Sequence, residues 1–374
     1  VALVGDQMKH HQGLSGKMFS ALGRNNVNIR AIAQGASERN ISAVIREEDV
    51  KKALNTLHEA FFEERIKQLN LFIMGVGNVG SRLMEQIRRQ QALLKNELRL
   101  QLRVVGISNS RSMVFDETGL DLDRWGDTLN QGQKADTQKF YDQVRKVNLR
   151  KSIFIENTAS EAVSGWYGRY LHESIAVVTC NKIACSSGYQ AYSQLKKTAR
   201  TFSAPFLFET NVGAGLPVID TLKNLIISGD RVHRIRAVLS GSLNFIFNHY
   251  DGSTPFASVV REAQRQGYTE PDPRIDLSGV DVMRKILILA RESGYSLELG
   301  TIENDSFLPA AAEEAKDVDA FYKALEASEG HFRKHYDQSA NKGHRLKYVA
   351  EFNEGKARVC LLYTSDAADD FAVV

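Results

Sequence analysis

An apolar run followed by a glycine fingerprint constrains the fold of this chain more than any other feature. Residues 69–74 read as a buried strand, which leads directly into Gly75-Val76-Gly77-Asn78-Val79-Gly80, a motif with the spacing G-x-G-x-x-G. An amphipathic helix is expected over residues 81–90. Glycines at this spacing allow a tight turn after the strand and let a pyrophosphate approach the N-terminus of the helix. The pattern predicts a doubly wound α/β domain that binds a dinucleotide.

The next strand of this domain ends without the acidic residue that commonly binds the ribose of NAD. Residues 102–108 form the expected strand, and Asn109, Ser110 and Arg111 follow it. An acid at this place would accept hydrogen bonds from the ribose hydroxyls, whereas Arg111 can face a 2′-phosphate. We therefore expect NADP rather than NAD, with an exposed arginine that binds no ligand as the alternative.

Two further strands are expected at residues 152–157 and 176–179, and the second ends in Cys180-Asn181-Lys182. Cofactors lie at this edge of doubly wound sheets, so Lys182 is a candidate for the nicotinamide or phosphate region. Cys180 and Cys185 raise the hypothesis of a thiol nucleophile. No histidine is near them in sequence and a buried cysteine is usually inert, so we do not expect a catalytic thiol.

Residues 269–285 are rich in acids and lead from a proline-stiffened loop into a helix. Ser278 can cap that helix, and Asp281 and Lys285 then stand at i and i+4 on one face. Acid, amine and loop carboxylates would converge on one small, charged substrate, as in a catalytic segment. The alternative is a capping box, Ser278-x-x-Asp281, followed by an ordinary helical ion pair.

Two Gly-containing turns lie between these segments. Residues 208–217 must bend where carbonyl groups can turn toward a cation, and residues 238–245 form a strand that leads into a polar turn. Either turn is also explained by local turn chemistry alone. With the helix of Asp281 and Lys285, the two turns form a second domain without a nucleotide signal of its own, as expected of a substrate domain.

The first 66 residues predict a small α+β sandwich. The polar turns of this region, including residues 34–40, suggest ligand sensing or dimerisation, with a purely structural role as the alternative. The expected order is a strand at 1–4, a helix at 16–24, strands at 28–34 and 41–45, and a helix at 48–62.

Composition narrows the class of protein. The chain has 374 residues, 43% hydrophobic and 25% charged, and a formal charge of +3 with acids and bases interspersed, which argues against a nucleic-acid surface. Three cysteines fit neither a disulfide framework nor a zinc spacing, and no run approaches the roughly 20 apolar residues that span a bilayer. We expect a cytoplasmic protein, or a plastid protein if the source is a plant. The strand-like opening at Val1 suggests a piece of a longer chain.

These motifs together resemble homoserine dehydrogenase over residues 69–359, and the 269–285 segment is the most specific part of the likeness. Residues 1–66 look like the last ACT domain of an aspartokinase, carried by Ala33-Gln34-Gly35-Ala36-Ser37-Glu38-Arg39-Asn40-Ile41-Ser42. The combination resembles the bifunctional aspartokinase-homoserine dehydrogenase family, with the kinase part missing and the C-terminus truncated. Kinase activity is therefore not expected.

The resemblance implies reversible NAD(P)H-dependent reduction of L-aspartate 4-semialdehyde to L-homoserine, a step toward threonine, methionine and isoleucine. Lys285 would donate the proton to the carbonyl oxygen, and Asp281 would position Lys285 and the substrate. Glu270 would hold the substrate's ammonium group with help from Asp276, and Lys182 would lie between cofactor and substrate.

The same resemblance implies ligand sets for the cofactor, a cation and a feedback amino acid. Gln34 matches a position that binds the feedback amino acid, for which threonine is the candidate. The cofactor set is Gly75, Gly77, Asn78, Val79, Gly80, Arg111, Thr158 and Lys182. A monovalent cation, typically sodium, would bind main-chain oxygens of Glu209, Val212, Ala214 and Leu216 in a structural role.

The expected organisation is an ACT domain at 1–66, an NAD(P)-binding Rossmann-type domain at 69–207 and a mixed α/β substrate and dimerisation domain at 208–345. A return segment would begin at 346–359, and residues 360–374 read as a non-native tail. We expect a homo-oligomer formed through the sheets.

Three other readings stay open. The chain could be a semialdehyde dehydrogenase, which would need an activated cysteine, or an amino-acid-sensing ACT fragment whose truncated reductase is inactive. It could also serve only as a structural partner that dimerises.

Overall fold

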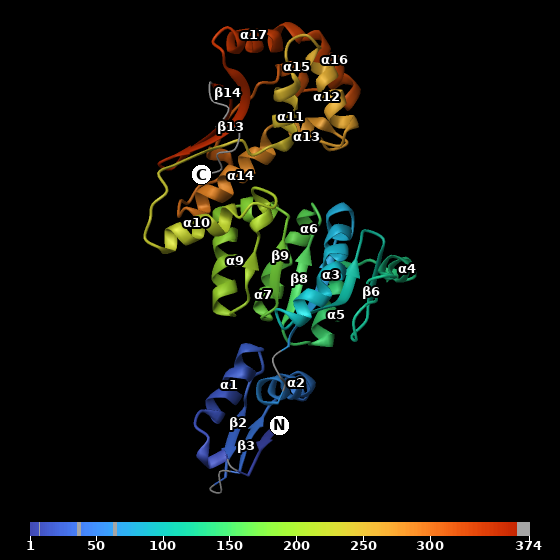
Figure 1. Ribbon diagram of the computed structural model, residues 1–374, viewed down its shortest axis with the longest axis vertical. Coiled ribbons are helices and arrows are strands. Elements are labelled where there is room, and N and C mark those ends of the chain that lie inside the picture. The colour runs from blue at the N-terminus through green and yellow to red at the C-terminus, as the bar shows by residue number, and fades with distance from the viewer. Residues whose placement is uncertain (7, 36–38, 63–65, 365–374) are drawn as a thin grey trace. The chain divides into compact units, whose positions relative to one another are not determined.

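The computed structural model describes residues 1–6, 8–35, 39–62 and 66–364, and the chain divides into two compact units. The first unit contains Val1–Ile183 and Ser193–Phe208, and the second contains Ala184–Tyr192 and the chain from Glu209 onward. Figure 1 shows the elements of both units in chain order. No helix of the described ranges is both long and apolar enough to cross a membrane.

The N-terminal module is the expected α+β sandwich. Its antiparallel sheet has the order β1-β3-β2, and the core lies between this sheet and the two helices. Burial alternates along β3, where Ile41 and Ala43 are buried and pack with Met18 and Leu22 of α1. The elements are β1 (Ala2–Val4), α1 (Leu14–Arg24), β2 (Ala31–Gln34), β3 (Asn40–Val44) and α2 (Val50–Phe61).

A seven-stranded sheet follows, with the order β10-β9-β8-β4-β5-β6-β7. The five strands from β10 to β5 are parallel, and β6 and β7 extend the sheet antiparallel. The strands are β4 (Lys67–Met74), β5 (Leu100–Ser108), β6 (Ser112–Phe115), β7 (Gln133–Lys134), β8 (Ser152–Glu156), β9 (Ala176–Thr179) and β10 (Phe206–Leu207). The helices are α3 (Asn78–Asn96), α4 (Trp125–Asn130), α5 (Thr137–Val147), α6 (Glu161–Ser164), α7 (Tyr167–His172), α8 (Ile183–Ser186) and α9 (Tyr189–Thr201).

The strand order fixes where a ligand can bind. From β4 the chain goes to β5 on one side and later returns to β8 on the other, so the order reverses between β4 and β8. At this reversal Asn157 donates its N–H to the carbonyl of Met74 at 2.8 Å, which brings the turns after the two strands together. Open α/β sheets bind ligands at the carboxyl ends of the strands at such a point.

The second unit is built on a four-stranded sheet of order β11-β13-β14-β12. Helix α14 (Val280–Glu292) packs on β13 and β14 with a mostly apolar face. The strands are β11 (Arg234–Ala237), β12 (Glu303–Asp305), β13 (Arg345–Asn353) and β14 (Lys356–Thr364). The other helices are α10 (Val218–Ile227), α11 (Gly241–His249), α12 (Phe256–Arg265), α13 (Pro273–Leu277), α15 (Ala310–Glu313), α16 (Val318–Ala327) and α17 (Glu329–Ala340).

The helix caps of the acidic segment differ from the expectation. Residues that were expected to form a loop make the short helix α13, which Asp272 caps by accepting from the N–H of Arg274. The N-cap of α14 is Gly279, with φ +75°, one residue later than predicted, while the Ser278 hydroxyl still accepts from the N–H of Val280 at 3.3 Å. A Cβ on Gly279 would lie 2.3 Å from the Tyr348 hydroxyl, so both backbone angle and space require glycine there.

The C-terminal strand is longer than the few residues expected. β14 continues through residue 364 and pairs antiparallel with β13 along its whole length. Residues 360–364 of the segment interpreted as a foreign tail therefore lie in this sheet, and residues 365–374 fall outside the described ranges.

Candidate active site

The three glycines of the fingerprint serve different purposes. Gly75 has φ +95°, and a Cβ on it would lie 2.8 Å from both the Asn157 carbonyl carbon and Thr158 Cγ2. A Cβ on Gly80 would lie 1.9 Å from the carbonyl oxygen of Gly75, so α3 can approach the strand only without a side chain there. Gly77 is exposed and a Cβ on it would contact nothing within 4 Å. The turn is therefore tight at its ends and open in the middle, where a pyrophosphate would approach.

Helix α3 presents its N-terminus at this opening. Gly77 is the N-cap, and the first intrahelical bond runs from the N–H of Ser81 to the carbonyl of Gly77. The N–H groups of Asn78, Val79 and Gly80 thus have no partner one turn back, as at every helix start. These donors and the helix dipole favour an anion at this place.

Arg111 lies in the turn between β5 and β6. The side chain of Asn109 shapes this turn, since its Oδ1 accepts from the N–H groups of Arg111 at 2.8 Å and Ser112 at 2.7 Å. Arg111 is exposed. This exposure fits both a contact with a cofactor and the alternative of an arginine that binds no ligand.

The turn after β8 (residues 157–160, the β8 turn) lies against the glycine turn. Thr158 donates its N–H to Glu156 Oε1 at 2.7 Å. Asn157 was missed by the sequence reasoning, yet its side-chain Nδ2 is buried and has no hydrogen-bond partner in the described part of the chain. A buried amide donor without a partner, beside Gly75 and Gly80, fits a site whose ligand supplies the acceptor.

The turn after β9 (residues 180–182, the β9 turn) carries Lys182, which is half-buried. Asn181 ties the two turns together, because its Nδ2 donates to the carbonyl of Ser160 at 3.1 Å. Thr158 and Lys182, which the sequence predicts as cofactor residues, are thus placed on neighbouring strand ends.

The cysteine of the β9 turn has the wrong electrostatics for a nucleophile. Burial raises the pKa of the Cys180 thiol, and the carboxylate of Glu156 raises it further. A catalytic cysteine needs the opposite shift. The environment of Cys180 therefore supports the expectation that the thiol is not catalytic and weighs against a semialdehyde dehydrogenase.

In the second unit, Asp281 and Lys285 lie on one face of α14 as expected. Lys285 Nζ is 2.7 Å from Asp281 Oδ2 and donates to the carbonyl of Leu239 at 2.7 Å. The side chain of Lys285 is 16% exposed and that of Asp281 is 40% exposed. The ammonium is therefore held at two points on the edge of solvent.

Asp276 organises the loop that carries Glu270. Its Oδ2 accepts from the N–H of Glu270 at 2.8 Å, and its Oδ1 accepts from the hydroxyl of Ser242 at 2.8 Å. The Ser242 hydroxyl also lies 2.6 Å from the carbonyl of Tyr268. Both oxygens of Asp276 thus accept hydrogen bonds, one from the main chain at Glu270 and one from the side chain of Ser242, while the Glu270 side chain is exposed.

The start of α11 connects the Lys285 ammonium with the Asp276 carboxylate. Leu239, whose carbonyl accepts from Lys285, comes three residues before Ser242, and Ser240 between them caps α11 by accepting from the N–H of Leu243 at 3.1 Å. The same end of α11 therefore contacts Lys285 on one side and Asp276 on the other. The predicted proton donor and the predicted ammonium site belong to one cluster.

Asp272 and Arg274 stiffen the acidic loop. The Arg274 guanidinium lies 2.5 Å from Asp272 Oδ2 and donates through Nη1 to the carbonyl of Ala315 at 2.8 Å. The hydrogen bond from Arg274 holds the pKa of the Asp272 carboxyl below its usual value. This pair anchors the start of α13, which carries Asp276.

The predicted cation turn is shaped by its own hydrogen bonds. The Glu209 carboxylate caps α10, accepting from the N–H groups of Ile219 at 2.8 Å and Asp220 at 2.9 Å, so its side chain is engaged elsewhere. Gly213 and Ala214 both have positive φ, +80° and +51°. No cluster of three or more His, Cys, Asp or Glu side chains suited to a metal occurs in the described residues. Main-chain oxygens of the kind that the resemblance implies suit a weakly held hard cation.

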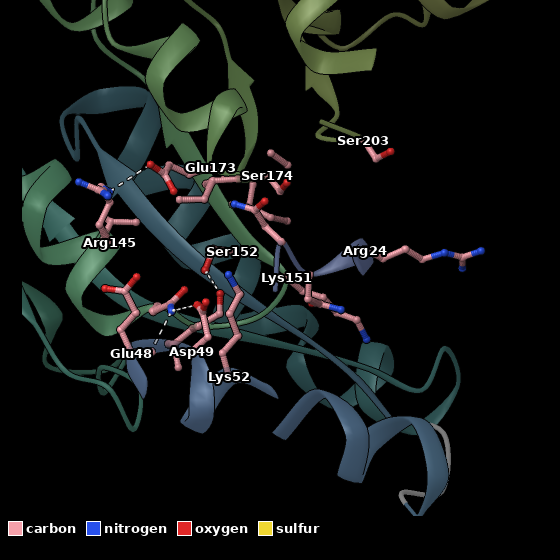
Figure 2. A pocket seen from close by; sticks show the side chains of 18 of the residues that line it. Arg24, Glu48, Asp49, Lys52, Arg145, Lys151, Ser152, Glu173, Ser174 and Ser203 are labelled. Carbon is pink, nitrogen blue, oxygen red and sulfur yellow. Dashed lines mark hydrogen bonds and ion pairs between the residues drawn. The ribbon is translucent and has the colours of Figure 1, made fainter. Parts of the chain in front are cut away.

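A cavity of about 820 Å³ lies elsewhere, between the N-terminal module and the amino ends of β4, β8 and β9. Figure 2 shows Asp49, Lys52 and Ser152 among its lining side chains. Lys52 is only 9% exposed, and burial lowers the pKa of its ammonium group. The cavity is at the opposite end of the strands from the glycine turn, so it is not the dinucleotide site.

Three family models match successive parts of the chain. A family model of the ACT domain matches residues 1–61, one described as "Homoserine dehydrogenase, NAD binding domain" matches residues 75–209, and one described as "Homoserine dehydrogenase" matches residues 217–370.

Curated relatives match nearly the whole chain. The bifunctional aspartokinase/homoserine dehydrogenase of Haemophilus influenzae is 40% identical over 363 residues, which is 97% of this chain and 44% of that protein. The chloroplastic bifunctional aspartokinase/homoserine dehydrogenase 2 of Arabidopsis thaliana is 41% identical over 93% of this chain and 38% of that protein. The chain spans about two fifths of the length of these relatives.

Solved structures share the fold. A crystal structure of a Candida auris protein of unknown function superposes with a TM-score of 0.71 at 27% identity, covering 82% of this chain and 87% of that one. A hyperthermophilic archaeal homoserine dehydrogenase in complex with NADPH superposes with a TM-score of 0.61 at 22% identity, covering 80% and 83%.

The fold and the family matches define a Rossmann-type NAD-binding domain followed by a homoserine dehydrogenase domain, with an ACT domain at the N-terminus. The chain belongs to the homoserine dehydrogenase family, and its domains match the C-terminal part of the bifunctional aspartokinase/homoserine dehydrogenases.

Proposed function

We propose that this chain catalyses the reversible NAD(P)H-dependent reduction of L-aspartate 4-semialdehyde to L-homoserine, in the biosynthesis of threonine, methionine and isoleucine. The observation that carries the proposal is the cluster of Asp281, Lys285 and the Leu239 carbonyl beside the acidic loop of Glu270. An ammonium for the reacting carbonyl and a carboxylate for the substrate's amine are the two groups this substrate requires.

Lys285 is the proton donor in this proposal. An ammonium group has three N–H donors, and the contacts with Asp281 and Leu239 leave one for the substrate's carbonyl oxygen. Bound NADPH would supply the hydride. Lys285 gives its proton to the oxygen as negative charge develops there, and takes it back in the reverse direction. Asp281 holds the ammonium in place and compensates its charge.

Glu270 binds the substrate's ammonium group. Its carboxylate is exposed on a loop that Asp276 fixes through the main chain, so we assign Asp276 a supporting role rather than a direct contact. Lys182, in the turn after β9, is the further substrate residue in this proposal.

NADP is the cofactor we propose, because Arg111 lies at the end of β5, where NAD-specific sites offer an acid. The pyrophosphate would lie at the N-terminus of α3 on the N–H groups of Asn78, Val79 and Gly80, with Gly75 and Gly77 giving room. Thr158 would contact the nicotinamide side of the cofactor, and Asn157 adds a donor there.

A monovalent cation, sodium in our proposal, would bind the main-chain oxygens of the turn that precedes α10, with a purely structural role. The positive φ of Gly213 and Ala214 supports this assignment, because it turns successive carbonyl groups in different directions. The oxygens would come from Glu209, Val212, Ala214 and Leu216.

The ACT domain would sense threonine and support self-association. Gln34 is the last residue of β2, which is an edge strand of the module and exposed along its length. An unpaired edge of this kind fits pairing with a second copy, and Gln34 would lie at that junction.

The proposal is tested by adding L-aspartate 4-semialdehyde to the purified chain with NADPH and identifying the product by chromatography. Homoserine should form in proportion to NADPH consumed. Succinic semialdehyde, which lacks the amino group, should react at least tenfold more slowly because Glu270 has nothing to hold. Equal rates with both aldehydes, or loss of activity in Cys180→Ser, would point to a different aldehyde chemistry.

A further inference from the structure

A buried carboxylate lies between the two turns that carry the predicted cofactor residues. Glu156, the last residue of β8, is fully buried. Its Oε1 accepts from the N–H of Thr158 at 2.7 Å and also from the Thr158 hydroxyl. Its Oε2 accepts from the Tyr167 hydroxyl at 2.5 Å and the Thr179 hydroxyl at 3.0 Å. One side chain thus satisfies four donors from three elements.

The bonds continue beyond the carboxylate into both turns. In the β8 turn, the Thr158 hydroxyl accepts from the N–H of Ser160 at 3.0 Å. In the β9 turn, the Thr179 hydroxyl accepts from the N–H of Asn181 at 2.9 Å. Asn181 then links the two turns directly, because its side chain donates to the carbonyl of Ser160 at 3.1 Å. The relative position of the β8 turn and the β9 turn is therefore set through Glu156.

We infer that Glu156 is a positioning residue for the nicotinamide half of the cofactor. The inference rests on the proposed function, since Thr158 and Lys182 matter only if a dinucleotide binds here. Glu156 lies behind the turns and does not touch the ligand itself. Its role is to hold Thr158 on one strand end and Lys182 on the next at the spacing that the nicotinamide requires.

The placement on the sheet makes this role selective. The pyrophosphate and adenosine parts of a dinucleotide lie over the glycine turn and the end of β5, while Glu156 acts on the ends of β8 and β9. Loss of Glu156 should therefore weaken contacts with the nicotinamide half and leave the adenosine half unaffected.

Glu156→Gln tests the inference, because the amide keeps the shape but turns two N–H donors toward groups that already donate. Binding to the full chain is measured by fluorescence titration with NADPH and, separately, with 2′-phospho-ADP-ribose, which is the same molecule without nicotinamide. We expect affinity for NADPH to fall about tenfold, the effect of leaving a buried polar group unsatisfied, with affinity for the fragment unchanged within twofold. The matched control is Glu161→Gln, an exposed acid on α6 that should behave as wild type.

A second pair of variants covers the case in which Glu156→Gln does not fold. Thr179→Val removes the hydroxyl that joins Glu156 to Asn181 and should show the same selective loss, whereas Thr179→Ser keeps the hydroxyl and should restore wild-type affinity. An equal loss for both ligands would mean a general structural role, and unchanged NADPH affinity in Glu156→Gln would also overturn the inference. If the wild-type chain itself binds no NADPH, both the proposed function and this inference fail. If the wild-type chain binds NADPH and the variants show no selective loss, only this inference fails.

Discussion

Asp281 and Lys285 form a 2.7 Å ion pair one turn apart on α14, and the same ammonium donates to a main-chain carbonyl 46 residues away in sequence. A surface i,i+4 pair contributes only a few tenths of a kcal/mol to stability. The Asp281–Lys285 pair differs from such a surface pair because Lys285 also contacts a main-chain carbonyl and its side chain is largely buried. The two contacts together fix the direction of the third N–H, as the proposed proton donation requires.

Asp281→Asn should lower kcat by about 10- to 100-fold, since the amide keeps the size but loses the charge that holds Lys285. Lys285 would still donate to Leu239, so the helix should stay folded. NADPH affinity should not change, because α14 belongs to the substrate domain. Steady-state kinetics and a cofactor titration measure both quantities. An unchanged kcat would show that Asp281 is only a helical ion-pair partner.

Asp276 and Glu270 should act as one unit. Asp276→Ala releases the N–H of Glu270 and the hydroxyl of Ser242, and Glu270→Gln removes the charge that binds the substrate's amine. Each change should raise KM for aspartate semialdehyde about tenfold. The double variant should be little worse than either single one, because both changes disable the same contact. A double-mutant cycle in which the effects add would mean that Asp276 has a separate role at the substrate.

Arg111→Ala should lower the preference for NADPH over NADH. Loss of a charge-assisted contact with a 2′-phosphate costs about 1.5 kcal/mol, roughly tenfold in KM for NADPH, with KM for NADH unchanged. The control is Arg82→Ala, which removes another exposed arginine, from α3. If the ratio of the two KM values is the same in wild type and Arg111→Ala, Arg111 does not determine the preference for NADPH over NADH.

The stability of the acidic loop should depend on pH through Asp272. Arg274 lowers the pKa of this carboxyl in the folded chain, so its contribution is complete above the unfolded pKa of about 3.9 and is lost as pH falls through the lower folded value. Asp272→Ala should cost about 1 kcal/mol at neutral pH, the usual effect of losing an N-cap. Urea unfolding at several pH values measures the difference in free energy of unfolding between wild type and Asp272→Ala. This difference should be constant above about pH 5 and should decrease below about pH 4. A difference that increases in acid would contradict the assigned shift.

Local patterns predicted the parts of this protein that depend on neighbours in sequence. The glycine turn, the order of elements in the N-terminal module and the Asp281–Lys285 spacing all follow from periodicity and motif chemistry. The glycine at the N-cap position 279 depends on Tyr348, on a strand far along the chain, which leaves no room for a side chain there. Capping rules that use only neighbouring residues do not include such a contact.

The site contains relationships that only packing creates. Leu239 offers a carbonyl to Lys285 because β11 and α11 bring that residue beside α14, and no side-chain pattern marks a main-chain acceptor. Asp276 looked like a second substrate carboxylate, yet its oxygens accept from the N–H of Glu270 and the hydroxyl of Ser242. Asn157 could have been found from its place at the end of β8, next to the strand-order reversal, once the sheet order was known.

The most direct test of the central claim is the loss of NADPH absorbance on adding aspartate semialdehyde to wild type and to Lys285→Met. Methionine keeps the apolar stem of the lysine and removes the proton donor. Wild type should turn over, and the variant should lose at least 100-fold in kcat while still binding NADPH, with Lys316→Met, an exposed lysine before α16, as the unaffected control. Turnover at the wild-type rate in Lys285→Met would contradict the account, because the proton would then come from another group.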